Sequence, residues 1–130
     1  MDKRELSERE ICSRFITPAL QQSGWNLQTQ IREERTLTDG RIHVRGSRTR
    51  RGPQKRADYV LEYRVNIPVA VVEAKKNEFS VGHGMPQAIE YAEMLQVPFA
   101  FSSNGDGFVF HDKTAAPQFD YLNRSRPVIS

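Results

Sequence analysis

The pattern of apolar and polar positions predicts a helix near the start of the chain. Apolar side chains recur at helical spacing between positions 11 and 19, and Gly24 ends the pattern. Ser7 and Glu10 stand just before it at the spacing of a capping box, in which each side chain accepts a hydrogen bond from the other's backbone. Pro18 should bend or shorten this helix, because proline lacks the N–H that a helix interior needs.

The rest of the pattern predicts six strands and a second helix. The run Val69 to Val72 is apolar at every position, which indicates a strand at the centre of a sheet and buried on both faces. In chain order the predicted elements are a weak strand at 27–37, strands at 41–45, 57–64 and 68–76, a helix at 85–96, and strands at 97–102 and 107–111. This order of a helix, four strands, a helix and two strands predicts an α/β sandwich around a mixed sheet.

Turn residues predict how neighbouring strands connect. Asp39 and Gly40 indicate a hairpin that would join the strand at 27–37 to the strand at 41–45. A short turn near Asn66 should join the two strongest strands, and residues 104–107, Asn-Gly-Asp-Gly, should form a hairpin between the last two. The segment 46–53 has no apolar period and is predicted to be an exposed loop.

Length and composition limit the class of protein. A chain of 130 residues with 38% hydrophobic and 27% charged residues has the size and composition of one globular domain, 1–130. No apolar run approaches the roughly 20 residues that span a bilayer, and the charged N-terminus does not resemble a secretory signal. Cys12 is the single cysteine, so neither an internal disulfide nor a C-x-x-C zinc site can form. We therefore expect a soluble cytoplasmic domain with no membrane partner.

Positive charge is concentrated in one part of the chain. The formal net charge is +3, and residues 41–56 contain no acidic residue. Clustered basic side chains neutralise phosphates, so this segment is a candidate nucleic-acid contact. The side chains expected to contact DNA are Arg48, Arg50, Arg51, Lys55 and Arg56. The alternative is a solvated loop with no binding function.

Two acidic residues and a lysine lie at the ends of the two strongest predicted strands. Asp58 opens the first of these strands, and Glu73, Ala74 and Lys75 end the second. Residues two apart share a face of a strand, so Glu73 and Lys75 should point the same way, and Asp58 should face one of them across the ladder. Paired carboxylates favour a hard divalent cation. The hypothesis is a Mg²⁺ site formed by Asp58, Glu73 and the Ala74 carbonyl, with Lys75 stabilising developing negative charge. The alternative is an ordinary surface ion pair between Glu73 and Lys75.

The same residues resemble a known nuclease motif. Asp58 followed by Glu73-Ala74-Lys75 is similar to the PD-(D/E)xK motif, with Ala57 where proline often stands. Gln87 and Tyr91 then match the Q-x-x-x-Y signature of the branch that contains RecB-like nucleases and type I restriction subunits. A spacing of four places both on one helical face. The alternatives are a core aromatic for Tyr91 and a polar residue at the start of a helix for Gln87.

Longer segments resemble the N-terminal nuclease domain of type I restriction enzyme R subunits. The resemblance extends over roughly residues 5 to 112 and is carried by segments 55–61, 70–75, 84–92 and 103–108, together with the opening helix. It implies a restriction-endonuclease-like three-layer sandwich, with a central mixed sheet flanked by helices. It also implies a Mg²⁺-dependent endonuclease, a type I site-specific deoxyribonuclease, that cuts unmodified foreign double-stranded DNA. In such an enzyme, cutting follows ATP-driven translocation by a helicase-like motor, and the methyltransferase and specificity subunits bring S-adenosylmethionine.

The chain departs from the complete subunit in one respect. It contains no G-x-x-x-x-G-K-[ST] phosphate-binding loop, so it cannot itself be the motor, and we expect it to be a fragment of a longer subunit. The alternatives are a stand-alone repair or junction nuclease and a non-cutting DNA-binding or subunit-docking module of the same fold. The family pattern also includes an acidic residue on the first helix. Glu8 is the preferred candidate, and Glu10 remains the alternative because it also belongs to the capping box.

Overall fold

The computed structural model describes residues 2–37, 42–45, 48–51 and 55–114. An opening 3₁₀ turn, Lys3–Glu5, precedes a helical segment made of α1 (Glu8–Ile11), a π-helical turn (Cys12–Ile16) and α2 (Thr17–Gln22). The later helix is α3 (Met85–Leu95). The strands are β1 (Ile31–Leu37), β2 (Ile42–Arg45), β3 (Arg48–Arg51), β4 (Lys55–Arg64), β5 (Ile67–Ala74), β6 (Phe99–Ser103) and β7 (Phe108–Asp112).

Five of these strands form a mixed sheet with the order β1-β4-β5-β6-β7. Its neighbours pair antiparallel except β5 and β6, which are parallel and are connected through α3. The prediction that Val69 to Val72 lie in the central strand is confirmed, because β5 is the middle strand of the sheet. The carboxyl ends of β5 and β6 therefore meet at one edge of the sheet, where Glu73 pairs with Ser102.

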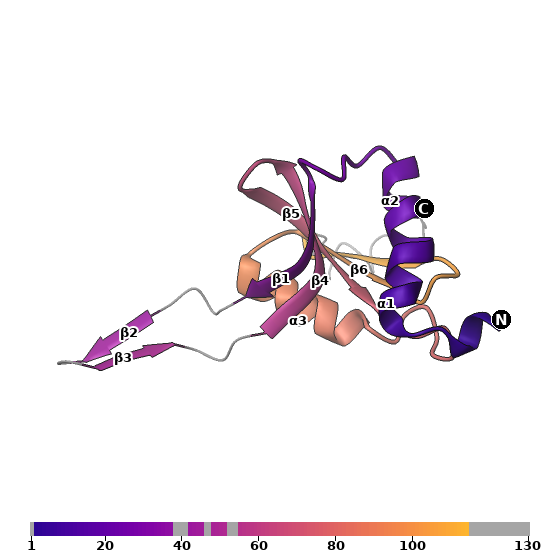
Figure 1. The fold of residues 1–130 in the computed structure, drawn as a ribbon. Helices are drawn as coiled ribbons and strands as arrows, with labels where there is room; N and C mark the ends of the chain where they lie inside the picture. The colour runs from indigo at the N-terminus through magenta and orange to yellow at the C-terminus, as the bar shows by residue number, and fades with distance from the viewer. Residues whose placement is uncertain (1, 38–41, 46–47, 52–54, 115–130) are drawn as a thin grey trace, which may run out of the picture.

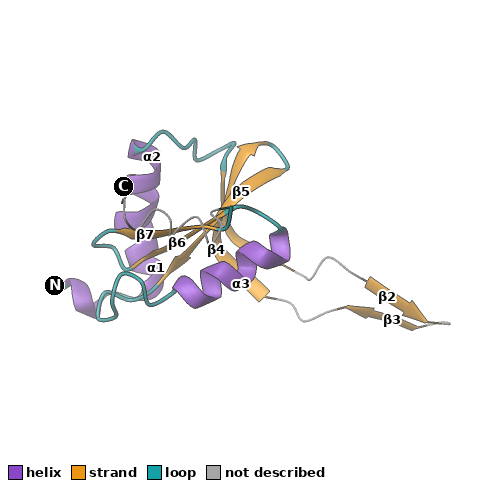
Figure 2. Cartoon of the chain, turned by 180° about the vertical axis from the view of Figure 1, so that it is seen from behind, coloured by secondary structure: helices purple, strands orange, loops and turns teal. Residues whose placement is uncertain are grey.

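Helices cover both faces of the sheet, which gives three layers (Figures 1 and 2). On one face Ile11, Ile16 and Leu20 of the opening helical segment pack against Leu61 and Val72. On the other face the buried side chains of α3 pack against β4, β5 and β6; this second core includes Val60, Val71, Ala88, Tyr91, Ala92 and Ala100. The predicted α/β sandwich around a mixed sheet is thus present.

The opening helical segment begins as predicted. The Ser7 N–H donates to Glu10 Oε1 at 2.9 Å, and the Glu10 N–H donates to Ser7 Oγ at 3.1 Å, which completes the capping box. The disturbance expected from Pro18 takes the form of a π-helical turn just before it, in which the Thr17 N–H bonds back to the Cys12 carbonyl. The helix then continues to Gln22, so proline does not shorten it.

Strand pairing in residues 31–51 differs from the prediction. The first strand, β1, pairs with β4 and not with Ile42–Arg45, which instead pairs with Arg48–Arg51 in a separate two-stranded hairpin. Both views show this hairpin apart from the five-stranded sheet (Figures 1 and 2). The predicted exposed loop at 46–53 was wrong for Arg48–Arg51, because a strand without apolar residues leaves no alternation to detect. The predicted Asp39-Gly40 turn lies outside the described residues.

The last hairpin forms as predicted, and its second strand is largely exposed. β6 and β7 pair antiparallel around the turn at 104–107, where Gly105 has a φ of 92° that favours glycine. Phe101 contacts both Phe108 and Phe110, and the last two are 39% and 54% exposed. β7 is an edge strand of the sheet, and its first four residues are exposed.

Candidate active site

The backbone ladder between β4 and β5 ends where the acidic residues begin. Its last recorded pair toward this edge is Tyr59 with Val72. Beyond it, side chains bridge the strands: the Asp58 N–H donates to Glu73 Oε2 at 2.9 Å, and the Ala74 N–H donates to Asp58 Oδ2 at 2.8 Å. Asp58 therefore lies against Glu73, in the arrangement that the predicted register required.

Both carboxyl groups have a raised pKa. The Glu73 residue is only 3% exposed, and its burial raises the pKa first, followed by repulsion from Asp58. Burial likewise raises the pKa of Asp58, opposed by the hydrogen bond from the Ala74 backbone. Each effect disfavours two negative charges in one buried place. The pair is therefore stabilised by a proton or by a cation.

Glu8 belongs to this group and Glu10 does not. Burial raises the pKa of Glu8, and the negative charge of Asp58 raises it further, so the two carboxylates interact. Glu10 accepts the capping hydrogen bond from Ser7 and faces Arg14 at 3.6 Å, and its pKa is lowered. The structure thus brings Glu8 toward the Asp58 end of the sheet, while Glu10 stays in the helix cap.

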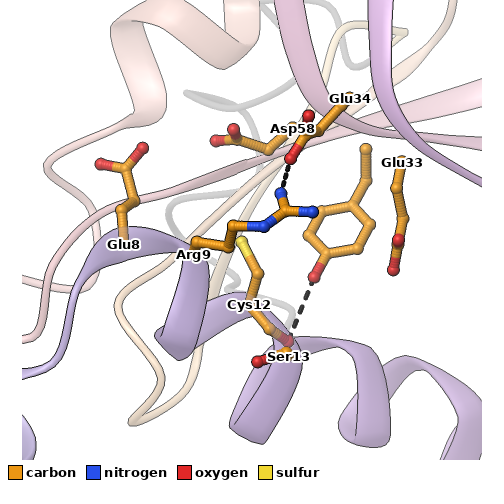
Figure 3. A pocket seen from close by; sticks show the side chains of 8 residues that line it. Glu8, Arg9, Cys12, Ser13, Glu33, Glu34 and Asp58 are labelled. Atoms are coloured by element: carbon orange, nitrogen blue, oxygen red, sulfur yellow. Dashed lines mark hydrogen bonds and ion pairs between the residues drawn. The ribbon is translucent and has the colours of Figure 1, made fainter.

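A cavity of about 380 Å³ opens beside Asp58, between the opening helix and the sheet. Figure 3 shows the Glu8 and Asp58 carboxylates in this cavity, with Arg9 reaching across to Glu34. The Arg9–Glu34 ion pair is largely exposed. Glu34 lies in β1 with a φ of 50°, and the β1–β4 pairing has a gap between its neighbours at this point. The sheet is therefore irregular beside the Asp58–Glu73 pair on the β1 side as well.

A buried hydroxyl network supports the wall of the cavity, and the sequence pattern did not reveal it. Tyr59 Oη donates to the Cys12 carbonyl at 3.2 Å and lies 2.7 Å from Thr17 Oγ1. Thr17 also donates to Glu33 Oε2 at 3.2 Å. The Cys12 carbonyl belongs to the π-helical turn, so Tyr59, the neighbour of Asp58, holds that turn over the sheet. Tyr59 alternates with Leu61 as an ordinary core residue would, and sequence alone offers no sign of this contact.

Lys75 follows Glu73 and is held through its backbone. Its N–H donates to the Ser103 carbonyl at 2.9 Å, which extends the parallel pairing of β5 with β6 by one residue. Its side chain is partly exposed. Its positive charge opposes the rise in the pKa of Glu8 and of Asp58 that burial causes. Lys75 thus lies within electrostatic reach of both carboxylates.

The two residues of the predicted helical signature differ in burial. Tyr91 is 5% exposed in the core between α3 and the sheet, and the charge of Glu73 contributes to raising its pKa after burial. Gln87 lies one turn earlier in α3 and is exposed. The structure therefore brings Tyr91 near the carboxylate pair and leaves Gln87 open to solvent.

The basic residues proposed for DNA binding are placed in part. Lys55 bonds to Glu90 of α3 at 2.5 Å, so its charge is compensated within the domain. Arg56 is 65% exposed and approaches Glu34 at 3.8 Å. Arg48, Arg50 and Arg51 belong to β3, and their side chains lie outside the described part of the structure.

Comparison with known proteins identifies the family. Residues 42–119 match the family described as "Type I restriction enzyme R protein N terminus". The chain belongs to this family. It is 50% identical over 111 residues to the "Type I restriction enzyme EcoAI endonuclease subunit" of Escherichia coli, which covers 85% of this chain and 14% of that subunit.

A solved structure supports the same assignment. It is described as the fragment structure of a putative HsdR subunit of a type I restriction enzyme from Vibrio vulnificus YJ016. The match has a TM-score of 0.69 and 48% sequence identity, and it covers 84% of this chain and 21% of that chain. This chain therefore spans well under a third of each of these two R-subunit relatives. No helix in the described residues is long and apolar enough to cross a membrane.

Proposed function

We propose that this chain is the Mg²⁺-dependent nuclease domain of a type I restriction enzyme R subunit. It would hydrolyse phosphodiester bonds of unmodified foreign double-stranded DNA after the rest of the subunit has translocated that DNA. The observation that carries the proposal is the hydrogen-bonded Asp58–Glu73 pair, where the first part of β4 lies beside the end of β5, in a chain of the R-subunit family. Lys75 lies beside the pair, so the proposed catalytic group is complete.

The donor set of the pair fits a hard divalent cation. The Glu73 carboxylate is buried and the Asp58 carboxylate beside it is partly buried, and no described residue forms an ion pair with either of them. No group of three His, Cys, Asp or Glu side chains in the described residues stands ready to hold a metal, so further oxygens must come from elsewhere. Asp58, Glu73 and the Ala74 carbonyl would hold Mg²⁺, with water or DNA phosphate completing the set. Bound there, the ion would supply an acidified water and charge neutralisation at the phosphate.

The remaining side chains have distinct proposed roles. Lys75, whose positive charge already acts on Asp58 and Glu8, would stabilise negative charge that develops on the phosphate. Glu8, with a raised pKa, would accept a proton from the attacking water. Tyr91 would help to fix the Glu73 side of the site, and the exposed Gln87 would contact DNA.

The basic segment would hold the DNA backbone. Arg56 is exposed at the start of β4, two residues before Asp58, so a phosphate bound there would lie close to the site. Arg48, Arg50 and Arg51 would add phosphate contacts from β3, and Lys55 would contribute after exchanging its bond to Glu90. Contacts of this kind give affinity without sequence preference.

The other activities would belong to other parts of the enzyme. The proposal assigns ATP-driven translocation to the motor region of the same subunit, and target recognition and S-adenosylmethionine to the specificity and methyltransferase subunits. The chain spans only 14% of its Escherichia coli relative, which leaves room for such a motor in a complete subunit.

Calorimetry of Mg²⁺ binding tests the proposed site directly. The unaltered protein should bind the ion, and Glu73→Ala should not. Glu78→Ala, an exposed acid in the loop after β5, serves as the matched control and should bind like the unaltered protein. Equal binding by the Glu73→Ala protein, with DNA present as well as without it, would overturn the metal assignment. In the complete enzyme, Asp58→Ala and Lys75→Ala should each abolish cleavage while the domain stays folded.

A further inference from the structure

We propose that the hydrogen bond between Ser102 and Gly84, called the latch below, positions the start of α3 against Glu73 and Lys75. Ser102 would then be a positioning residue for Glu73 and Lys75, at the end of β5. The inference rests on the proposed nuclease function and adds residues that neither the sequence motif nor the family match assigns.

Ser102 is fully buried and uses its hydroxyl group twice. The hydroxyl donates to the Val81 carbonyl at 2.7 Å and accepts the Gly84 N–H at 3.0 Å. Both partners lie in the loop that leads from β5 to α3, while Ser102 lies in β6 as the parallel partner of Glu73. The Ser102 side chain therefore ties this loop to β6, the strand that pairs with the Glu73 end of β5.

Gly84 lies close to the side chains of Ser102, Glu73 and Lys75. A Cβ atom at this position would lie 3.1 Å from Ser102 Oγ, 3.4 Å from Glu73 Cβ and 3.4 Å from Lys75 Cγ. Its φ of −86° is open to any residue, so the backbone conformation does not require glycine here. The close approach of Ser102 Oγ favours glycine instead, because an added methyl group would crowd that hydroxyl and touch the stems of Glu73 and Lys75.

The latch connects the Glu73 and Lys75 side chains to α3. The Gly84 carbonyl accepts the Ala88 N–H at 2.9 Å, so the same residue begins the helix that carries Gln87 and Tyr91. The Lys75 ammonium makes no hydrogen bond or ion pair with a described residue, and its stem lies close to Gly84 at the start of α3. A shift of the helix start would move the lysine relative to the carboxylates.

Two alanine substitutions at neighbouring glycines give a matched test. In the complete enzyme, Gly84→Ala should lower the single-turnover cleavage rate by about threefold to tenfold, because the neighbouring side chains must shift by a few tenths of an ångström. DNA affinity should change by less than about twofold, because the basic residues proposed to supply most of the affinity lie on β3 and β4. Gly82→Ala, whose added Cβ would meet only Val109 at 3.6 Å, should cleave like the unaltered enzyme. Equal cleavage by the two variants would overturn the inference.

A double-mutant cycle tests the hydroxyl. Ser102→Ala should slow cleavage without a matching loss of DNA affinity, whereas Ser80→Ala, an exposed serine of the same loop, should not. Combining Ser102→Ala with Gly84→Ala removes the oxygen that lies nearest to the new methyl group. The combined effect should therefore be smaller than the product of the two single effects. Strict additivity would overturn the coupling between the two residues.

These results remain separate from the fate of the proposed function. If the unaltered enzyme cuts DNA and Glu73→Ala does not, the nuclease proposal holds and the glycine pair decides the latch. If Glu73→Ala cuts like the unaltered enzyme, the nuclease proposal fails and the latch, which rests on it, fails with it. The unfolding midpoint of each variant, measured in parallel, shows whether a slower enzyme is simply less folded.

Discussion

Two buried acidic residues at opposite ends of the central strand pair have very different surroundings. Glu62, near the end of β4, is 1% exposed and lies 3.1 Å from Arg32 Nε and 3.6 Å from Arg35, and it also accepts the Asn66 N–H. Glu73, near the end of β5, is 3% exposed and lies against a second carboxylate, Asp58. The first charge is compensated within the domain, and the second is not.

This contrast separates structural from functional burial of charge. A buried carboxylate costs free energy unless cations or donors surround it, and Glu62 has both from its own sheet. The Asp58–Glu73 pair has backbone donors but no ion pair with a described residue. The positive charge of Lys75 lowers the pKa of Asp58 without offsetting its burial, so the site stays unfavourable for two negative charges until a cation binds. Sites that bind charged ligands commonly have this property, at a cost to stability.

The strongest test exchanges each acid for its neutral amide. Glu73→Gln should lower cleavage by the complete enzyme by roughly three orders of magnitude, because the proposed metal loses a ligand. Glu62→Gln should leave the cleavage rate of the folded protein within about threefold. Rates of plasmid linearisation at matched folded concentration measure both. Loss of cleavage in the Glu62 variant and not in the Glu73 variant would reverse the comparison.

Stability should respond in the opposite order. Glu62→Gln leaves Arg32 without its partner, and because that arginine is partly exposed the expected loss is about 2 kcal/mol of unfolding free energy. Glu73→Gln should not destabilise the metal-free domain at neutral pH, since it removes a carboxyl group whose ionisation is opposed by burial and by the charge of Asp58. Urea denaturation in the presence of a chelator gives both values. A larger loss for Glu73→Gln would show that the second site is balanced internally after all.

The pH dependence of stability gives a further test of the Asp58–Glu73 end of the strand pair. The pKa of Glu73 is raised in the folded state, so the folded protein binds more protons and loses stability as pH rises above the ordinary value of 4.5. The metal-free domain should therefore have a lower unfolding midpoint at pH 8 than at pH 5, and Glu73→Gln should reduce this dependence. Added Mg²⁺ should raise the midpoint most at pH 8. Identical slopes in the unaltered and Glu73→Gln proteins would contradict the assignment.

The smallest expected effect concerns an exposed ion pair at the mouth of the cavity. The side chains of Arg9 and Glu34 are 76% and 43% exposed, so solvent screens their attraction. Arg9→Ala should change the unfolding free energy by less than about 0.5 kcal/mol, whereas Arg32→Ala should cost clearly more. Parallel urea titrations compare them. An Arg9 effect equal to that of Arg32 would mean that burial does not distinguish these pairs.

The sequence predicted those parts of the molecule that rest on local pattern. The capping box at Ser7, the helix at Met85–Leu95 and the central position of β5 follow from caps, helical spacing and an unbroken apolar run. The contact between Asp58 and Glu73 followed from strand register. The catalytic and metal-binding roles of these residues stay predictions.

Other parts depend on contacts that no local pattern encodes. The pairing of β1 with β4 skips a whole hairpin, and β3 has no apolar residue to mark it as a strand. In the sequence, Glu62 is a charged residue of a predicted strand with no sign that it is buried. Its burial depends on two arginines from β1. The role of Ser102 likewise depends on a loop that returns from β5, and only the folded structure brings them together.

The position of the β2–β3 hairpin has a consequence for how such domains can vary. Leu37 and Lys55, which flank residues 38–54, are direct partners in the β1–β4 ladder, so the chain leaves and re-enters the sheet at one point. Doubling the length of such an excursion costs only about 0.6 kcal/mol of closure entropy. Insertions and deletions here can therefore accumulate during evolution, or be grafted by design, while the paired strands that carry Asp58 and Glu73 keep their register.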